Sequence, residues 1–334
     1  MDLTWRAISE AQPGPKWAGL FAEYWSDYRD WWSREGIEAR PTYRECQRAM
    51  QTHMPELVPL WDELCAIVGG GDMASRFLSF WRPPPYLSGC SQAVWPGAQP
   101  VLVRNYDYNP NAFDRLILRT EWQGRTVIGT SDGLFGLVDG MNDAGLAISL
   151  TFGGRRVVGN GFGVPLILRY VLQTCTTAEE AGEVLARVPT HMSYNVTVLD
   201  KKRNLRTVLM APDRPAQITH AAVATNHQDK PEWEAHARAT ATIERERFLL
   251  QRLTLHVEPE EKFIGAFLKP PLYSTAFDHG FGTLYTAVYR PRRGEMELRW
   301  PQAVWSLPIA GFVDQARSIF TPPPAQQSSR HFAS

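Results

Sequence analysis

The feature that most constrains how this chain folds is a pair of strand-like segments, 91–95 and 101–108, joined by residues 96–100. Residues 96–100 read Pro-Gly-Ala-Gln-Pro, and a proline- and glycine-rich connection between two such segments is typical of a β-hairpin. Counting back symmetrically from the turn places Cys90 opposite Tyr106, to within about one residue. The sequence therefore predicts a hairpin with a cysteine at the start of its first strand.

The residues around this cysteine suggest that it is a nucleophile. We expect the protein to cut its own Gly89–Cys90 bond, so that Cys90 becomes a new N-terminus with its thiol as nucleophile and its α-amino group as base. The reference pKa values of these two groups, about 8.5 and about 7.7–8.0, make that proton transfer feasible near neutral pH. Glycine suits the scissile position because it tolerates backbone conformations that a β-carbon forbids. A buried structural cysteine is the alternative interpretation of Gly-Cys alone.

The second strand of the hairpin carries two charged residues that fall close to the cysteine, Arg104 and Asp107. A carboxylate at this place could hold the new ammonium group by a charge-assisted hydrogen bond, and a guanidinium would favour the thiolate. A surface ion pair is the alternative interpretation of these two residues.

Composition excludes several classes of protein and site. The 334 residues have a formal net charge of zero, which favours neither nucleic acid nor an anionic membrane as a partner. Hydrophobic residues make up 44% and charged residues 21%, as in globular proteins with a large core. The sequence has no signal-like N-terminus and no CxxC spacing among its four cysteines, so we expect a cytoplasmic protein. The eight histidines are scattered, and no metal site is expected.

The proline run at 83–85 divides the chain into two parts, followed by a tail. Residues 1–89 are predicted to be a mainly helical segment, because aromatic residues recur there at helical spacings. Residues 90–320 are predicted to be a β-rich core, and residues 321–334, rich in Pro, Gln and Ser, a disordered tail.

Within the core, segments of strand and helix character alternate. After the hairpin we expect strands near 115–122 and 126–130, a buried hairpin over 136–152, and helices that begin at Pro165 and after Thr177. Strands over 193–199, 205–210 and 217–225 should follow. One long helix over 234–255 and strands over 284–288, 295–300 and 303–305 complete the predicted core. This order predicts an α+β fold in which sheets pack against helices.

The ordered set of motifs resembles the N-terminal-nucleophile (Ntn) hydrolases, in particular the family of acyl-CoA:6-aminopenicillanate acyltransferase and, more distantly, the choloylglycine (bile salt) hydrolases. The motifs are Gly89-Cys90, Arg104-Asn105-Tyr106-Asp107, the segment from Asp139 to Leu146, Tyr194-Asn195, Thr225-Asn226-His227 and Arg247-Phe248. The resemblance implies a four-layer αββα sandwich and autoproteolytic release of the nucleophile. It also implies that residues 1–89 stay bound as a separate chain after the cut.

The resemblance implies a role for each residue of the catalytic set. Cys90 would be the nucleophile, Arg104 would sit against its thiolate and Asp107 would hold its amine. Asn226 would donate its side-chain amide to the oxyanion of the tetrahedral intermediate. Arg247 would be the second arginine, which orders the site.

Four further positions are candidates for oxyanion or substrate binding: Thr151, Asn195, Tyr106 and His227. Bile salt hydrolases have an asparagine where this chain has Thr151, so Asn195 or a nearby backbone amide could be the second oxyanion donor. Asn195 could equally be an edge polar residue. His227 is considered as a pocket residue, because this mechanism needs no histidine.

Two ambiguities remain at the sequence level. Arg245 could replace Arg247 as the second arginine, since the alignment of the long helix is loose. Asn142 is interpreted as a turn former in its Asn-Asp-Ala-Gly turn rather than as a catalytic group.

The leading functional hypothesis is a self-processing cysteine amidohydrolase or acyltransferase that acts on a linear amide or acyl thioester through an acyl-Cys90 intermediate. One alternative is a dedicated hydrolase of an N-acyl amino acid or a β-alanyl amide, without transferase activity. Another is a catalytically silent binding protein with the same fold. We expect no cofactor, although an acyl-CoA could be a substrate, and the expected partners are a small amide or acyl donor and the protein's own fragment 1–89. Homo-oligomerisation is left open.

Overall fold

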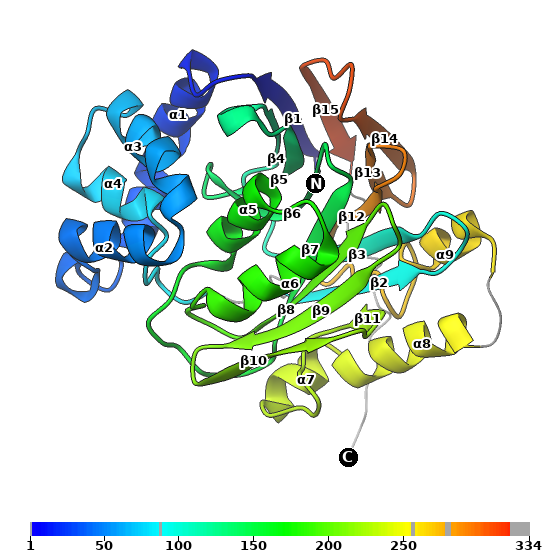
Figure 1. Cartoon of the computed structure of the whole chain (residues 1–334). Helices are drawn as coiled ribbons and strands as arrows, with labels where there is room; N and C mark the ends of the chain where they lie inside the picture. Colours follow the sequence, from blue (N-terminus) through cyan, green and yellow to red (C-terminus); the bar gives the residue numbers. More distant parts are fainter. Residues whose placement is uncertain (1, 87–88, 255–257, 278–281, 321–334) are drawn as a thin grey trace.

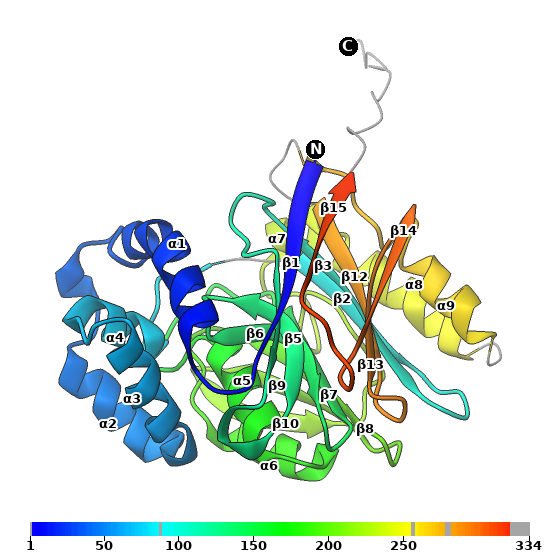
Figure 2. The ribbon, with the colours of Figure 1, turned by 90° about the horizontal axis from the view of Figure 1, so that it is seen from above.

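The fold contains two β-sheets that lie face to face (Figures 1 and 2). The computed structural model describes residues 2–86, 89–254, 258–277 and 282–320. In spatial order, the larger sheet consists of β10 (Arg214–Thr219), β9 (Leu205–Ala211), β8 (Tyr194–Asp200), β7 (Leu146–Phe152), β6 (Gly136–Asn142), β5 (Val127–Asp132), β4 (Leu116–Thr120), β1 (Asp2–Glu10) and β15 (Gln315–Phe320). The smaller sheet consists of β11 (Val223–Ala224), β2 (Gly89–Trp95), β3 (Val101–Tyr108), β12 (Gly282–Arg290), β13 (Glu295–Trp300) and β14 (Ala303–Pro308).

Helices cover the outer face of each sheet, which gives the predicted αββα order of layers. Helices α5 (Val164–Thr174) and α6 (Ala178–Arg187) pack on the larger sheet, and α8 (Thr242–Thr254) and α9 (Glu260–Ala266) on the smaller one. The inner faces meet where β7 packs against β2 and β3. Because every residue of β2, β6 and β7 except Trp95 is buried, both faces of these strands are covered and their sequences are largely apolar.

The N-terminal segment is helical over most of its length, as predicted, and contributes one strand that the aromatic spacing did not indicate. Its helices are α1 (Pro15–Trp32), α2 (Tyr43–His53), α3 (Val58–Ile67) and α4 (Asp72–Leu78). Strand β1 lies between β4, to which it is parallel, and β15, to which it is antiparallel. Leu3, Trp5 and Ala7 are buried at alternating positions along this strand, so the segment forms part of the core sheet.

Local sequence signals account for the starts of two helices. Thr42 and Thr177 are the N-caps of α2 and α6, and each forms a complete capping box with the glutamate three residues later, Glu45 and Glu180. Helix α5 begins at Val164, with a proline in its first turn, as predicted.

The single helix predicted over 234–255 is instead two helices, α7 (Glu234–Ala239) and α8, with residues 255–257 outside the described part of the chain. The break falls at Ala241, whose backbone has φ +46°, a conformation that a helix cannot contain. The strand predicted over 217–225 is also divided, because β10 ends in the larger sheet and β11 belongs to the smaller one. Helix α9 was not predicted, and the tail 321–334 lies outside the described residues.

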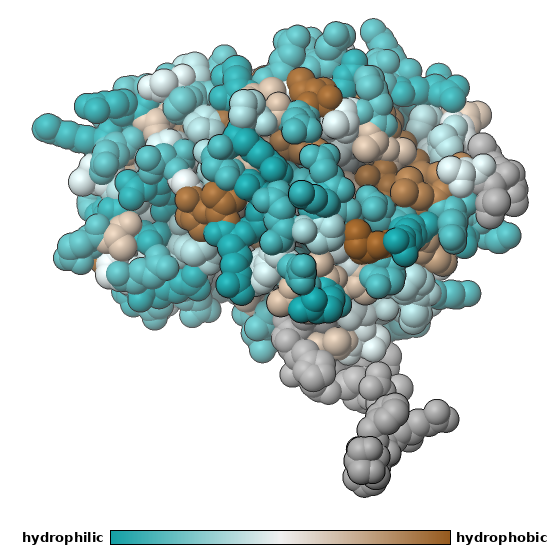
Figure 3. Space-filling view, turned by 90° about the horizontal axis from the view of Figure 1, so that it is seen from below, coloured by the Kyte–Doolittle hydropathy of each residue, from teal (hydrophilic) through white to brown (hydrophobic). Residues whose placement is uncertain are grey.

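The surface has the character of a globular domain. The face shown in Figure 3 is mostly hydrophilic, and its hydrophobic residues gather into small, separate patches. Among the described helices, none combines the length and the apolar character needed to cross a membrane.

Candidate active site

The hairpin of β2 and β3 places Cys90 at the centre of the candidate site. Cys90 pairs with Tyr106 and Gly89 with Asp107, which confirms the register counted from the turn. Side chains alternate along a strand, so Arg104 and Tyr106 point to one face of the sheet and Asp107 to the other. Cys90 therefore lies where two sets of polar contacts meet: one set reaches its thiol and the other reaches its backbone.

Arg104 faces the larger sheet and contacts the thiol. Its Nη2 lies 3.2 Å from the Sγ of Cys90, its Nε donates to the carbonyl of Leu150 at 2.8 Å, and its Nη1 forms an ion pair with Asp139 on β6. Arg104 and Asp139 are both completely buried. Burial disfavours the charged guanidinium, but the negative groups around it, Cys90 first, raise the pKa of Arg104 above its ordinary value. A permanent positive charge thus lies against the sulfur.

Asp139 is held by hydroxyl groups as well as by the arginine. Its carboxylate accepts hydrogen bonds from Tyr285 at 2.7 Å, Tyr289 at 2.5 Å and Thr130 at 2.7 Å. Since the remaining lone pairs of the buried ion pair are satisfied in this way, the guanidinium of Arg104 is fixed in place.

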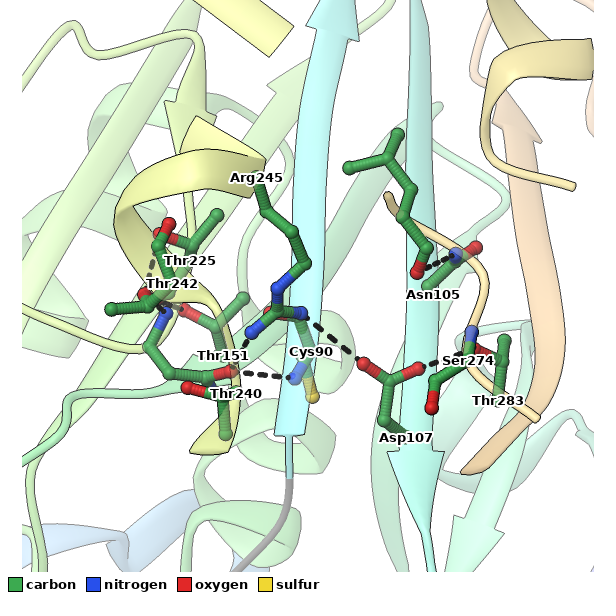
Figure 4. A network of polar contacts seen from close by, with 12 residues as sticks. Cys90, Asn105, Asp107, Thr151, Thr225, Thr240, Thr242, Arg245, Ser274 and Thr283 are labelled. Atoms are coloured by element: carbon green, nitrogen blue, oxygen red, sulfur yellow. Dashed lines mark hydrogen bonds and ion pairs between the residues drawn. The ribbon is translucent and has the colours of Figure 1, made fainter. Parts of the chain in front are cut away.

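On the other face, Arg245 of helix α8 reaches the backbone of Cys90 (Figure 4). Its Nη1 donates to the carbonyl oxygen of Cys90 at 2.9 Å and lies 3.2 Å from Asp107, and its Nη2 donates to Oδ1 of Asn226 at 2.6 Å. Asp107 also accepts a hydrogen bond from Thr283 at 2.7 Å. Burial raises the pKa of Asp107, although the guanidinium of Arg245 acts against this rise.

Asn226 lies next to Cys90, with its side-chain oxygen towards the cysteine nitrogen. Its Oδ1 accepts from the backbone nitrogen of Cys90 at 3.0 Å and from Arg245, while its Nδ2 donates to the carbonyl of Phe152 at 3.2 Å. Two donors on one side of the side chain, and a carbonyl on the other, orient it with the oxygen towards Cys90. Asn226 is therefore an acceptor for the cysteine nitrogen, and its role as an oxyanion donor stays a prediction.

Arg247 is not part of the site, which corrects the choice between the two arginines. Arg247 is exposed, whereas Arg245 is 3% exposed and contacts Cys90, Asp107 and Asn226. Residues two apart on a helix point in nearly opposite directions, so only one of the two can face the sheet.

This difference gives a matched pair of variants. Arg245→Met should slow self-cleavage by at least about tenfold and lower the free energy of unfolding by about 3–5 kcal/mol, because Asp107 would lose its buried ionic partner. Arg247→Met should leave the free energy of unfolding within about 0.5 kcal/mol of the wild type. Urea unfolding and the time course of chain cleavage measure both effects, and similar losses in the two variants would contradict the assignment of Arg245.

Three of the four less specific candidates support the site rather than line it. Asn195 donates through Nδ2 to Thr151 at 3.1 Å and to the carbonyls of Thr225 and His227 at 2.9 Å, and Thr151 donates to the carbonyl of Thr225 at 2.8 Å. These contacts fix the backbone on both sides of Asn226. The Nδ1 of His227 lies 3.0 Å from the hydroxyl of Thr242, at the start of α8.

Tyr106, the fourth candidate, lies against the arginine that contacts the thiol. Its ring is buried, and the guanidinium carbon of Arg104 is 4.4 Å from the ring centroid. Asn142, interpreted as a turn former, has a structural role: its side chain donates to the carbonyls of Leu172 and Cys175 and accepts from the nitrogen of Leu146.

Sequence reasoning missed Asp139, Thr242 and Thr283 as supports of the site. Asp139 gives a signal, because it is a lone carboxylate in the apolar strand Gly136-Leu-Val-Asp139 and so requires a buried partner. Thr242 and Thr283 give none, since threonine is common in helix starts and strands. Among the described residues, no group of three or more His, Cys, Asp or Glu side chains could hold a metal ion.

Comparisons with known proteins find several similar solved structures. Among solved structures, the chain is similar to a mutant of the conjugated bile acid hydrolase from Clostridium perfringens (13% identity, 68% of this chain and 96% of the other, TM-score 0.41). It is also similar to the Caenorhabditis elegans ortholog of N-acylethanolamine-hydrolyzing acid amidase (16% identity, 66% of this chain and 100% of the other, TM-score 0.45). A third similar structure is penicillin V acylase from Agrobacterium tumefaciens (15% identity, 69% of this chain and 90% of the other, TM-score 0.40). No curated protein matches the sequence.

The family comparison is more specific. The sequence model of acyl-coenzyme A:6-aminopenicillanic acid acyl-transferase matches residues 95–305, more than half of the chain. Arg104, Asp107, Asn226 and Arg245 lie inside the match, and Cys90 lies just before it. The chain thus belongs to the acyl-coenzyme A:6-aminopenicillanic acid acyl-transferase family.

Proposed function

We propose that this protein is a self-processing cysteine amidohydrolase or acyltransferase that uses Cys90 as its nucleophile. The observation that carries the proposal is the set of contacts on Cys90: Arg104 touches its sulfur, Asn226 its nitrogen and Arg245 its carbonyl oxygen. A purely structural cysteine would not need a buried guanidinium against its sulfur, since burying that charge is costly.

In the processing step, the Sγ of Cys90 attacks the carbonyl carbon of Gly89. A C–S bond forms, the C–N bond between the two residues breaks, and the released nitrogen takes up a proton to become an amine. Water then cleaves the thioester, which leaves a carboxylate on Gly89 and a free thiol on Cys90. Asn226 supports this step because its Oδ1 already accepts from the nitrogen that becomes the leaving amine.

In turnover, the new α-amine takes the thiol proton and the thiolate attacks the carbonyl of a linear amide. The substrate nitrogen leaves after receiving that proton, and an acyl thioester remains on Cys90. Water completes hydrolysis, or a second amine takes the acyl group and completes transfer. Arg104 stabilises the thiolate, while Arg245 and Asn226 hold the cysteine backbone and its amine in place.

A thiol-directed acylating reagent tests the nucleophile. With a phenylacetyl thioester we expect one acyl group on the fragment that begins at Cys90 and none on the other cysteines, because burial raises the pKa of Cys46, Cys65 and Cys175 to about 11. Peptide mass mapping locates the adduct. Labelling of another cysteine, or of none, would refute the assignment.

The fate of the acyl group on Cys90 distinguishes a hydrolase from an acyltransferase. If transfer occurs, rising concentrations of an added amine such as glycinamide should divert the acyl group from free phenylacetate into the new amide. If the protein is a dedicated hydrolase, phenylacetate alone should accumulate at every amine concentration. Quantifying the two products by chromatography decides between these activities.

A further inference from the structure

A cavity of about 280 Å³ lies where the N-terminal helical segment meets the core. Helix α1, the residues that follow α4, the loop after β3 and the end of β5 form its walls. Its volume is close to the lower end of the range for small-molecule sites, which start at about 300 Å³. Both fragments of a processed chain would contribute to this cavity.

The cavity adjoins the residues around Cys90. Tyr108 and Phe113 line it, and the ring of each lies against Tyr106, with centroids 5.6 and 5.4 Å apart. Tyr106 is the cross-strand partner of Cys90. Tyr86, which also lines the cavity, precedes Cys90 by four positions. Through Tyr106, the wall of the cavity is thus in contact with the residues that surround Cys90.

Eight of the seventeen residues that line the cavity are aromatic. Besides Tyr86, Tyr108 and Phe113, they come from α1, α4 and the residue that follows α4 by two positions, including Tyr28, Trp31 and Phe77. The faces of aromatic rings carry partial negative charge, so a wall of this kind attracts cations as well as apolar groups.

The carboxylates in the wall favour a cation over an apolar group as the ligand of this cavity. Asp114 and Asp132 line the inner wall, and Asp27 is exposed where the cavity borders α1. Asp114 is fully engaged, because it accepts from Tyr28, from the hydroxyl of Ser131 at 3.2 Å and from the nitrogen of Leu134 at 3.2 Å.

Asp132, in contrast, has no ion-paired cation among the described residues, although the charge of Arg104 and a hydrogen bond from the backbone nitrogen of Gly133 partly offset the effect of burial on its pKa. The hydroxyl of Tyr28 lies 3.5 Å from its carboxylate, but that hydroxyl has one proton, which it also donates to Asp114. Arg115 also lines the cavity, and its positive charge partly offsets the effect of burial on the pKa of Asp114, but no ion pair of Arg115 is found among the described residues. A partly buried carboxylate without an ion-paired cation therefore lies beside aromatic rings.

We propose that this cavity binds an ammonium group, and that the amide on which Cys90 acts carries such a group. The second part of this statement rests on the proposed function. Asp132 would supply the charge-assisted hydrogen bond, and the rings around it would contact the rest of the ligand. At pH 8, where Asp132 is ionised, a neutral group in the cavity would leave this carboxylate without an ionic partner, which is unfavourable.

The pH dependence follows from the carboxylates. Burial, together with the neighbouring Asp114, raises the pKa of Asp132 to about 7, and burial raises the pKa of Asp114 to about 6. Both groups are therefore negative at pH 8 and largely protonated below pH 6. Two neighbouring groups do not change charge in this range: burial raises the pKa of Tyr28, and the negative groups around Arg104 raise the pKa of its guanidinium. Cation binding should weaken several-fold from pH 8 to pH 6.

Three probes of similar size test the proposal on the full-length protein. We expect 2-phenylethylammonium to bind at pH 8 at least about tenfold more tightly than 2-phenylethanol, and 3-phenylpropanoate to bind more weakly still. Isothermal titration calorimetry measures all three. Equal binding of the cation and the alcohol, or tighter binding of the anion, would overturn the proposal.

A matched pair of variants locates the effect. Asp132→Asn should lose most of the preference for the cation and keep the weak binding of the alcohol. Asp62→Asn, at an exposed carboxylate on α3, removes the same charge and should leave all three affinities unchanged. If Asp132→Asn does not fold, the three-probe series on the wild type still decides. A preference for the cation that survives in a folded Asp132→Asn would overturn the assignment to Asp132.

These measurements are independent of the proposed chemistry, because the probes contain no amide and bind without reaction. If Cys90 is acylated but the protein shows no preference for the cation, the cation site is rejected and the proposed function still stands. A cation preference in a protein whose Cys90 is never acylated would instead reject the proposed function and leave the cation site standing.

Discussion

Cys90→Ala is expected to abolish cleavage of the chain completely. The wild type should separate under denaturing conditions into two fragments that meet between Gly89 and Cys90, and the variant should remain a single chain, because alanine has no sulfur to attack the preceding carbonyl. Intact mass measurement on both proteins checks this result. Turnover of any amide substrate should be lost in the same variant.

Cys175→Ala is the matched control for this experiment. Cys175 is also a buried cysteine, and burial raises the pKa of its thiol to about 11, so it should remain a protonated thiol at neutral pH. This variant should cleave as the wild type does. A wild-type chain that stays intact under all conditions would favour the silent binding protein instead.

Arg104→Met is expected to destabilise the protein as strongly as Arg245→Met. The substitution leaves Asp139 buried without its cation, and breaking a buried pair in this way costs about 3–5 kcal/mol. It also removes the donor that lies 3.2 Å from the sulfur of Cys90, so self-cleavage should slow by at least about tenfold in the protein that still folds. Urea unfolding followed by tryptophan fluorescence measures the first effect, and the time course of cleavage the second.

Arg125→Met provides the comparison, because Arg125 forms an ion pair with Asp143 near the surface. Surface pairs of this kind contribute less than about 1 kcal/mol, and the bond to Asp143 lies outside the contacts that surround Cys90. If Arg104→Met were no less stable than Arg125→Met, Arg104 and Asp139 would not form a necessary buried pair.

The family-level assignment and the residue-level roles rest on different observations. The sequence match covers Arg104, Asp107, Asn226 and Arg245 but not Cys90, so membership of the family does not itself identify the nucleophile. That assignment depends on the contacts of Cys90, which is why the variants at Cys90 and Arg104 are the decisive experiments.

Local signals in the sequence were sufficient for the hairpin and its register. The turn at 96–100 and the segments beside it determine which residues pair, and Cys90 lies opposite Tyr106 as the count predicted. The capped start of α6 and the proline at the start of α5 are local in the same sense. Such features depend on neighbours within a few residues, so they can be read without a structure.

Tertiary structure alone decided the features that depend on distant partners. Strand β1 pairs with β4 and β15, which are more than a hundred residues away, so nothing in its own sequence specifies its neighbours. The choice of Arg245 over Arg247 depends on the rotation of α8, which the break at Ala241 sets. Likewise, the orientation of Asn226 depends on Phe152 and Arg245, which belong to other elements.

The sequence by itself therefore indicated the family through its ordered motifs, and the resemblance to that family implied the order of layers and most of the residues around Cys90. Only the tertiary structure decided which buried charges form pairs: Arg104 with Asp139, and Arg245 with Asp107. It also decided that Asp132 faces an aromatic cavity without a paired cation among the described residues. Pairing of buried charges depends on the packing of both sheets and α8 together, and no local pattern records it.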